Sequence, residues 1–322
     1  MLIIDEATAQ QVVGMADAID VVERAFVALE CGEAETFPVV MGHGSLAETG
    51  FAVKSGVIRS QGLVGLKVGT YWPANRQAGL PSHGSTTLFL DDATGFPRAM
   101  VSAAYLTAMR TAAADAVAVK RLARPDARHL GVVGAGHQAW FDLLAIREVR
   151  PIDRLLVWNR DPAGAERFAE RARQLGLTAR AASLEETARG ADILVTATAA
   201  RQPLVMRDWI APGTHISAMG ADAAGKQELD IALVAAGELF ADIIGQSVIL
   251  GEFEAAARAG LIRPEEVRTL GSAIVGAVPA RSGDAAITIF DSSGTGLLDL
   301  AIGALAIDRC AATGRGCQIA FS

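Results

Sequence analysis

The order of helix-like and strand-like segments in the middle of the chain limits its possible folds more than any other feature. A long helix pattern begins at Leu106 and ends before Pro125. The segments that follow alternate between strand and helix patterns: "RHLGVVG", "AWFDLLAIREV", "RLLVWNR", "AGAERFAERARQLG", "ADILVTATAA" and "THISAMGAD". Such alternation is typical of right-handed βαβ units in a parallel sheet. Residues 116–296 are therefore predicted to form a doubly wound α/β domain of the Rossmann type.

The two ends of the chain mix helix and strand patterns without this alternation. Two helices are expected within "IDEATAQQVVGMADAIDVVERAFVALECG", and a hairpin is expected at "DDATGFPRAMVSA". The last helix pattern, from about Gly296, is amphipathic and is expected to pack against the N-terminal half. Residues 1–115 and 297–322 are therefore predicted to form one discontinuous α+β domain.

Composition and charge agree with such a fold and exclude several classes of function. The chain has 322 residues, of which 51% are hydrophobic but only 5% are aromatic, so its core is built mainly from aliphatic side chains. The formal net charge of −7 attracts neither nucleic acid nor an anionic membrane. The five histidines have no paired spacing, so no metal site is expected.

The cysteines and the N-terminus favour a cytoplasmic setting. The three cysteines, Cys31, Cys310 and Cys317, are too few and too scattered for a disulfide framework. The first ten residues carry acids where a signal peptide needs lysine or arginine. No apolar run approaches the roughly 20 residues of a membrane helix.

The stretch "HLGVVGAGHQAW" carries a dinucleotide-binding fingerprint. Gly134, Gly136 and Ala139 match G-x-G-x-x-G/A after an apolar strand and at the start of a helix. Gly134 permits the tight turn, Gly136 lets the backbone approach a pyrophosphate, and Ala139 allows close packing of helix on sheet. We therefore expect NAD or NADP as cofactor. His137 is expected to lie exposed at the helix start rather than to act in catalysis.

The end of the next strand is the place that selects between the two cofactors. It reads "VWNRDP", in which Asn159 stands where NAD enzymes usually place an acid. Arg160 could form a bidentate pair with a 2′-phosphate, which favours NADP. Two alternatives remain open at this point: Asp161 could hold the ribose, and Arg160 could point into solvent.

Lys67 lies in an uncharged strand pattern, "LVGLKVGTYW", between Gly65 and Gly69. With a period of two residues, these glycines lie on the same face as the lysine, which predicts empty space beside it for a small molecule. The alternative is a lysine on an edge strand that prevents aggregation.

Two further charged residues stand in unusual surroundings. Arg110 shares a helical face with alanines and a leucine, so it is either buried with a partner or aimed at a cavity. A bound carboxylate would serve as that partner, as would a distant structural acid. Asp222 follows the strand pattern "THISAMGA", where open α/β sheets place ligands and where it could move protons on a substrate nitrogen. It could equally cap a helix.

Together these segments resemble the ornithine cyclodeaminase/mu-crystallin family over nearly the whole chain. The pieces that carry the resemblance are "GLKVGTYWP", "GLPSHGSTTLFLDDATG", "LTAMRTAAADAVAVKRLA", "LGVVGAGHQA", "VWNR", "MGADAAGKQELD" and "TIFDSSGTGLLDLA". "YWPAN", "GAGHQ", "GKQELD" and the last piece look closest to the iminosuccinate reductase branch. The resemblance implies a Rossmann domain inserted into a dimerising α+β domain, and activity on α-imino or α-amino acids.

The resemblance also implies roles for individual residues. Lys67 would bind the substrate carboxylate and assist proton transfer at the imine, Arg110 would clamp the same carboxylate, and Asp222 would act as acid and base. The residues expected to contact the cofactor are Gly134, Gly136, His137, Gln138, Ala139, Asn159, Arg160, Thr196, Met219, Ser293 and Gly294.

One position departs from the family pattern. Many members have a third carboxylate-binding arginine shortly after the early proline, where this chain has Met41. Lys54, Arg59 or Arg76 could replace it; otherwise the substrate carries less negative charge.

Three functions are compatible with these residues. The first is a reductase that converts an α-imino acid to an L-amino acid with NAD(P)H; the resemblance to the iminosuccinate reductase branch implies the conversion of iminosuccinate to aspartate. The second is a lyase that cyclises ornithine with recycled NAD⁺, and the third is a non-catalytic binding protein. Net consumption of the reduced cofactor separates the first from the second.

Overall fold

The computed structural model describes residues 1–46 and 48–321, which divide into two compact units. The first unit comprises Met1–Arg110 and Thr295–Ser322, and the second comprises Thr111–Gly294. Helix α3, Ala104–Leu122, contains the boundary between them. The domain boundaries expected from the sequence remain a prediction, because compactness does not by itself demonstrate independent folding.

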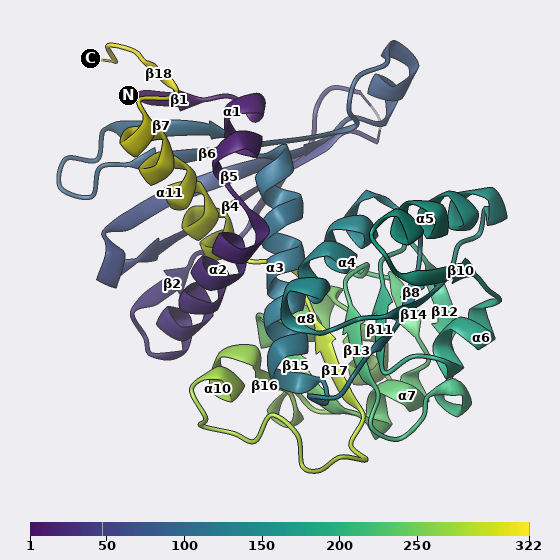
Figure 1. The fold of residues 1–322 in the computed structure, drawn as a ribbon. Helices are drawn as coiled ribbons and strands as arrows, with labels where there is room; N and C mark the ends of the chain where they lie inside the picture. The colour runs from purple at the N-terminus through teal and green to yellow at the C-terminus, as the bar shows by residue number, and fades with distance from the viewer. Residues whose placement is uncertain (47, 322) are drawn as a thin grey trace. The chain divides into compact units, whose positions relative to one another are not determined.

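The first unit is a mixed sheet covered on one face by helices (Figure 1). The sheet order is β18-β1-β7-β6-β5-β4-β2, and β3 also pairs with β4. The elements of the unit besides α3 are β1 Leu2–Ile4, α1 Glu6–Val12, α2 Met15–Glu30, β2 Ala34–Thr36, β3 Val40–Gly42, β4 Gly50–Ile58, β5 Leu63–Tyr71, β6 His83–Leu90, β7 Pro97–Ser102, α11 Gly296–Thr313 and β18 Cys317–Gln318. The expected hairpin is confirmed as the antiparallel pair β6–β7.

Helices α2 and α11 cover the face of the sheet that carries Lys67. Ile19, Val22 and Phe26 of α2 are buried. Leu300 of α11 lies over Gly65 of β5, so the last helix packs on the N-terminal half as expected. The opposite face carries Val64, Leu66 and Val68 of β5 with apolar neighbours on β4 and β6, and these side chains are only half-buried.

The second unit is built on an eight-stranded sheet in which every recorded strand pair is parallel. Its order is β10-β9-β8-β11-β13-β17-β15-β16, and helices pack against it as the alternating pattern predicts (Figure 1). The sheet strands are β8 His129–Val133, β9 Arg154–Trp158, β10 Thr178–Ala181, β11 Ile193–Thr196, β13 His215–Ala218, β15 Glu238–Ala241, β16 Arg268–Thr269 and β17 Thr288–Asp291. A separate pair joins β12 Arg201–Val205 to β14 Gln227–Leu229.

The first helix that lies wholly within the second unit is α4, which begins at the dinucleotide fingerprint. The helices are α4 His137–Val149, α5 Pro162–Gln174, α6 Leu184–Arg189, α7 Ile231–Ala236, α8 Ile244–Leu250, α9 Glu254–Arg258 and α10 Leu270–Ile274. The core beneath them is aliphatic, with Val133, Leu194, Ile216 and Ile289 buried in one cluster. Within residues 1–46 and 48–321, no helix combines the length and apolar character that crossing a membrane requires.

Candidate active site

Lys67 lies in the centre of a sheet, because β5 pairs with β4 on one side and β6 on the other. The edge-strand interpretation is therefore wrong. The side chain is only 6% exposed, and its Nζ lies 3.0 Å from both carboxylate oxygens of Asp299. A lysine in such a place needs a counterion, and helix α11 supplies one.

Arg110 reaches the same carboxylate. Its Nε donates to Oδ1 of Asp299 at 3.1 Å, and the arginine and the aspartate are 7% and 2% exposed. The structure therefore brings Lys67 and Arg110 together, as the sequence suggested, and it also gives the arginine a structural acid as partner. Asp299 was not among the predicted site residues. The signal for it was a lone acid in the apolar helix pattern "GLLDLAIGALAI".

The electrostatics of this cluster favour an anion. Burial is the largest effect on Lys67 and lowers its pKa to about 8; Asp299 opposes this shift, while Arg110 and Lys54 reinforce it. Burial alone would raise the pKa of Asp299, but the charges of Lys67 and Arg110 outweigh burial and hold it below its usual value. The carboxylate of Asp299 thus contacts two cations, Lys67 and Arg110, and a bound carboxylate would reduce the excess of positive charge.

The two glycines beside Lys67 differ in the space they leave. A Cβ on Gly65 would lie 2.3 Å from the carbonyl oxygen of Leu88 and 3.0 Å from Leu300, so that side is filled. A Cβ on Gly69 would meet only Cε of Lys67, at 3.9 Å. The expectation of empty space on both sides is wrong for Gly65, because α11 packs there, and correct for Gly69.

The fingerprint turn in the second unit has the form that a pyrophosphate requires. Gly134 has φ of +102°, and a Cβ there would lie 2.6 Å from the carbonyl oxygen of Ala197. Gly136 has nothing within 4 Å of its Cβ position, and as the N-cap residue it has no side chain with which to cap α4. Ala139 is fully buried. The residues present therefore fit a dinucleotide at the helix N-terminus.

Side chains around this turn have distinct surroundings. His137 is exposed, and its ring lies 4.9 Å from that of Phe141. Gln138 donates to Oδ1 of the buried Asp142 at 2.7 Å. Asn159 accepts from the amide of Ala135 at 3.3 Å, which ties the end of β9 to the fingerprint turn.

The surroundings of Asp161 and Arg160 bear on the two alternatives left open for the cofactor ribose. Asp161 accepts from the amides of Ala163 and Gly164 at the start of α5 and pairs with Arg167, so its carboxylate serves as a helix cap. Arg160 is exposed and has neither a hydrogen bond nor an ion pair among the residues the structure describes.

The remaining predicted cofactor contacts lie where parallel strands end side by side. Thr196, Ala218 and Asp291 occupy one register across β11, β13 and β17. Two buried acids organise the loops that follow these strands, and neither was predicted from the sequence. Their hydrogen bonds join Glu228 to Thr196, Thr198 and Gly220, and Asp242 to Ser292, Ser293 and Gly294. Met219 follows β13 directly and is held by its amide to the carbonyl oxygen of Thr196 at 2.8 Å.

Asp222 differs from the other predicted site residues in its exposure. Its side chain is 63% exposed and pairs with Lys226 four residues later. It lies in the second unit, whereas Lys67 and Arg110 lie in the first. Its role as acid and base remains a prediction.

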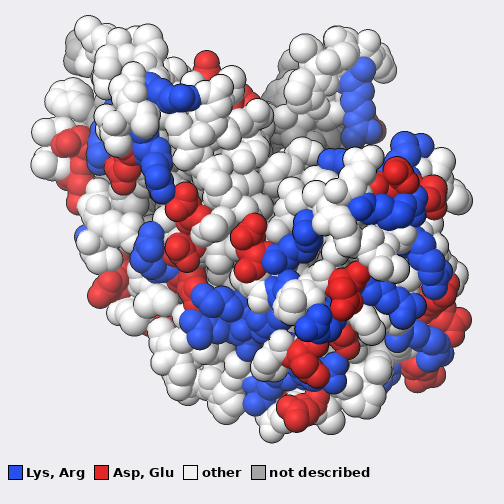
Figure 2. Space-filling view, in the orientation of Figure 1, with Lys and Arg blue, Asp and Glu red and all other residues white. Residues whose placement is uncertain are grey.

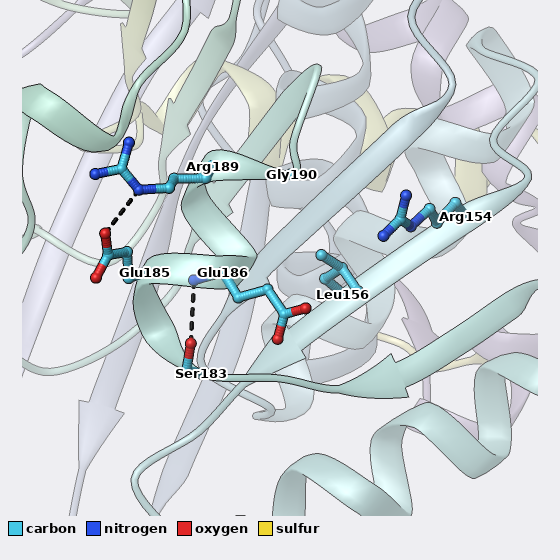
Figure 3. A pocket seen from close by; sticks show the side chains of 7 residues that line it. All are labelled: Arg154, Leu156, Ser183, Glu185, Glu186, Arg189 and Gly190. Atoms are coloured by element: carbon cyan, nitrogen blue, oxygen red, sulfur yellow. Dashed lines mark hydrogen bonds and ion pairs between the residues drawn. The ribbon is translucent and has the colours of Figure 1, made fainter.

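A surface pocket of about 390 Å³ lies beside α6 (Figure 3), but its lining does not contain a buried cluster of charged groups like that of Lys67, Arg110 and Asp299. Its charged groups are used within the helix and its surroundings: Arg189 pairs with Glu185 at 2.7 Å, and Glu186 pairs with Arg180. Acidic and basic side chains are similarly interspersed over the face of the second unit that Figure 2 shows. These exposed pairs contribute little to stability, because water and salt screen their charges.

Comparison with known proteins places these features in a family context. The ornithine cyclodeaminase/mu-crystallin family model matches residues 2–314. The iminosuccinate reductase of Paracoccus denitrificans is 40% identical over 302 residues, which cover 94% of each chain. Its structure in complex with NAD⁺ superimposes with a TM-score of 0.95 and covers 99% of each chain.

Two further solved structures are similar over their whole length. An archaeal alanine dehydrogenase dimer with bound NAD has a TM-score of 0.95 and 33% identity, and covers 100% of this chain and 99% of its own. The Δ1-pyrroline-2-carboxylate reductase of Thermococcus litoralis, in complex with NADH and L-proline, has a TM-score of 0.93 and 31% identity, and covers 99% of this chain and 100% of its own.

Proposed function

Because the chain belongs to the ornithine cyclodeaminase/mu-crystallin family, we propose that it is an NAD(P)H-dependent reductase of α-imino acids to L-amino acids. The observation that carries the proposal is the buried cluster of Lys67 and Arg110 on Asp299, with the space beside Gly69. A dinucleotide cradle in the second unit supports it.

Each group of the cluster has a distinct task in this reaction. Lys67 and Arg110 bind the α-carboxylate of the imine and fix its orientation, while Asp299 positions both cations. A bound reduced nicotinamide supplies the hydride that the imine carbon receives. Protonated Lys67 gives its proton to the imine nitrogen, so the carbon accepts the hydride without a negative charge developing on nitrogen.

The test is consumption of NADH or NADPH with a panel of 2-oxo acids plus ammonia or methylamine, and with preformed cyclic ketimines. Lys67→Met and Arg110→Met should each lower kcat/KM about 100-fold or more, because each loses a charged hydrogen bond and Lys67 also loses the proton donor. The matched control is Arg59→Gln, which removes a surface cation paired with Glu35.

Two results would reject the proposal. One is wild-type kcat/KM in both variants while their melting temperatures show them to be folded. The other is ammonia release from ornithine without net consumption of reduced cofactor, which would identify a cyclodeaminase. Binding of the cofactor without turnover of any imine would instead support a binding protein.

The proposal includes a preference for NADPH over NADH. The exposed Arg160 follows the neutral Asn159 at the end of β9, where a 2′-phosphate would find a cation. The carboxylate of the next residue, Asp161, is held by the amides of Ala163 and Gly164. Arg160→Gln should raise the Kd for NADPH about tenfold and leave the Kd for NADH unchanged. Equal effects on both cofactors, measured by nicotinamide fluorescence, would reject this preference.

The proposal also includes a homodimer in a cytoplasmic setting. The half-buried apolar face of the first unit, which carries Val64, Leu66 and Val68, is a surface on which a second copy could pack. The three cysteines are free, which suits a reducing compartment.

A further inference from the structure

We infer that Asp115 of α3 and Asp142 of α4 form an acid pair that bears a proton and positions Gln138 for the dinucleotide. This role rests on the proposed function and adds two positioning residues to its cofactor cradle. Three buried carboxyl oxygens of the pair, both of Asp115 and Oδ2 of Asp142, receive no hydrogen bond from the residues the structure describes. Buried polar atoms are rarely left in this state, so the protonation of the two acids has to account for it.

Both carboxyl groups lie in a dry interior without a counterion. Asp115 and Asp142 are each 0% exposed, and neither forms an ion pair with a basic side chain in the described part of the chain. Burial is the largest effect on each group and raises its pKa, and the charge of Asp115 raises the pKa of Asp142 further. Two ionised carboxylates that repel each other without a counterion are strongly disfavoured, so the pair keeps at least one proton.

A buried histidine and two hydroxyl groups beside the pair have their hydrogens assigned by their partners. Burial lowers the pKa of His215 to about 3, so its ring is neutral and carries one hydrogen. Oγ1 of Thr288 donates its only hydrogen to the carbonyl oxygen of Leu122 at 3.1 Å. Nδ1 of His215, 2.8 Å from Oγ1 of Thr288, therefore carries the ring hydrogen. Nε2 is left as an acceptor, to which Oγ of Ser217 donates at 3.2 Å.

The hydrogen of Ser217 decides which acid of the pair is protonated. Asp115 interacts with this serine, whose only hydroxyl hydrogen is already given to His215. A hydroxyl that donated to Asp115 would favour its ionised form, but Ser217 can only accept. The carboxyl group of Asp115 therefore supplies the hydrogen between them. A neutral Asp115 also adds no negative charge beside Asp142.

The other acid of the pair connects it to the cofactor cradle. Oδ1 of Asp142 accepts from Nε2 of Gln138 at 2.7 Å, across one turn of α4. Gln138 lies two residues after the N-cap Gly136, in the turn whose amides would face a pyrophosphate. An ionised Asp115 would repel the carboxylate that holds this amide, whereas a neutral one leaves it in place. The pair thus fixes the orientation of Gln138.

The binding test is a double-mutant cycle on the Kd for NADH, measured by nicotinamide fluorescence. Asp142→Leu should raise the Kd about tenfold, because it removes the acceptor that holds Gln138. In a Gln138→Leu background the same change should have less than about a twofold effect, since Asp142 acts through Gln138. Asp142→Asn keeps an accepting oxygen and should restore the Kd to within about threefold of wild type. The control is Asp153→Asn, which changes an exposed acid paired with Arg128.

An infrared comparison tests the proton directly. The difference spectrum between wild type and Asp115→Asn at neutral pH should contain the C=O stretching band of a protonated carboxylic acid, and Asp153→Asn should not remove this band. Absence of the band from the difference spectrum would overturn the inference. Additive effects of Asp142→Leu and Gln138→Leu would also overturn it, as would an equal Kd for Asp142→Asn and Asp142→Leu. Asp142→Ala takes the place of the leucine variant in the cycle if that variant does not fold.

The outcome for the acid pair is separable from that for the proposed function. Both measurements use binding and spectroscopy and need no imine. If NADH binds with the expected dependence on Asp142 and Gln138 but no imine is reduced, the reductase proposal fails and the acid pair stands. If imines are reduced but the cycle is additive, the reductase proposal stands and the acid pair fails.

Discussion

At the scale of single residues, Asp299 controls the stability of the first unit. It is the acid that holds two buried cations, and removing one partner of a buried pair costs about 3–5 kcal/mol because a charge is left uncompensated. Asp299→Asn should therefore lower the free energy of unfolding by about that amount, measured by urea denaturation. Asp17→Asn, which breaks the exposed pair with Arg309, should cost no more than about 1 kcal/mol. Similar losses in the two variants would contradict this role.

The same cluster sets the pH dependence of the reaction. Lys67 binds the carboxylate and donates its proton only when it is charged. Since its pKa is lowered to about 8, the charged form dominates below that pH and is lost as the pH rises through it. With a preformed cyclic ketimine, a plot of kcat/KM against pH should therefore have a descending limb, in which kcat/KM falls about tenfold per pH unit above the pKa of Lys67. Lys54→Gln removes one of the charges that lower this pKa, so the limb should move to higher pH; a limb that stays in place would contradict the assignment.

At the scale of one element, the two glycines of β5 provide a matched pair. Gly65→Ala places a methyl group against a carbonyl oxygen and Leu300, so it should reduce stability by about 1–3 kcal/mol. Gly69→Ala has room and should not destabilise the strand, but its methyl group occupies the space beside Lys67. It should raise KM on the order of tenfold without lowering the melting temperature. If instead Gly69→Ala lowered stability and Gly65→Ala raised KM, the space for the ligand would not lie beside Gly69.

The elements that could be predicted from the sequence are those with a strong hydrophobic period. The alternation from Leu106 onward predicts the parallel sheet of the second unit, and the apolar stripe containing Val22 and Phe26 predicts the buried face of α2. The face of β5 that α11 covers was not predicted. The period-two pattern of β5 places the larger apolar side chains on the opposite face of the strand. The face under α11 carries glycine and lysine, which do not indicate burial unless the helix that covers them is known.

At the scale of the whole molecule, the apolar face opposite Lys67 predicts the oligomeric state. Val64 lies opposite Leu90, and Leu66 opposite Leu88, so apolar side chains form a continuous strip across two strands. Leu66→Lys should convert the proposed dimer to a monomer in light scattering after gel filtration, because a lysine there would be desolvated against its copy. Leu80→Lys, in an exposed loop, is the control and should leave the dimer intact. A dimeric Leu66→Lys variant would place the interface on another surface.

Separation along the chain explains which residues of the site could be predicted from the sequence. Lys67 and Arg110 each stand out locally, one between glycines and the other on a stripe of alanines. Their shared acid lies 232 residues from Lys67, and no local pattern connects residues at that separation. Glu228 and Asp242 were missed for a related reason, since a buried acid that holds loops through backbone amides resembles any other loop acid in the sequence.

The position of Asp299 in the chain also orders the events of biosynthesis. Lys67 and Arg110 leave the ribosome first, followed by the whole of the second unit, and the aspartate that neutralises them emerges only with α11. The second unit is contiguous and can fold while translation continues. The two positive charges of the first unit remain hydrated until α11 has been synthesised, so the core around them can close only after that helix arrives.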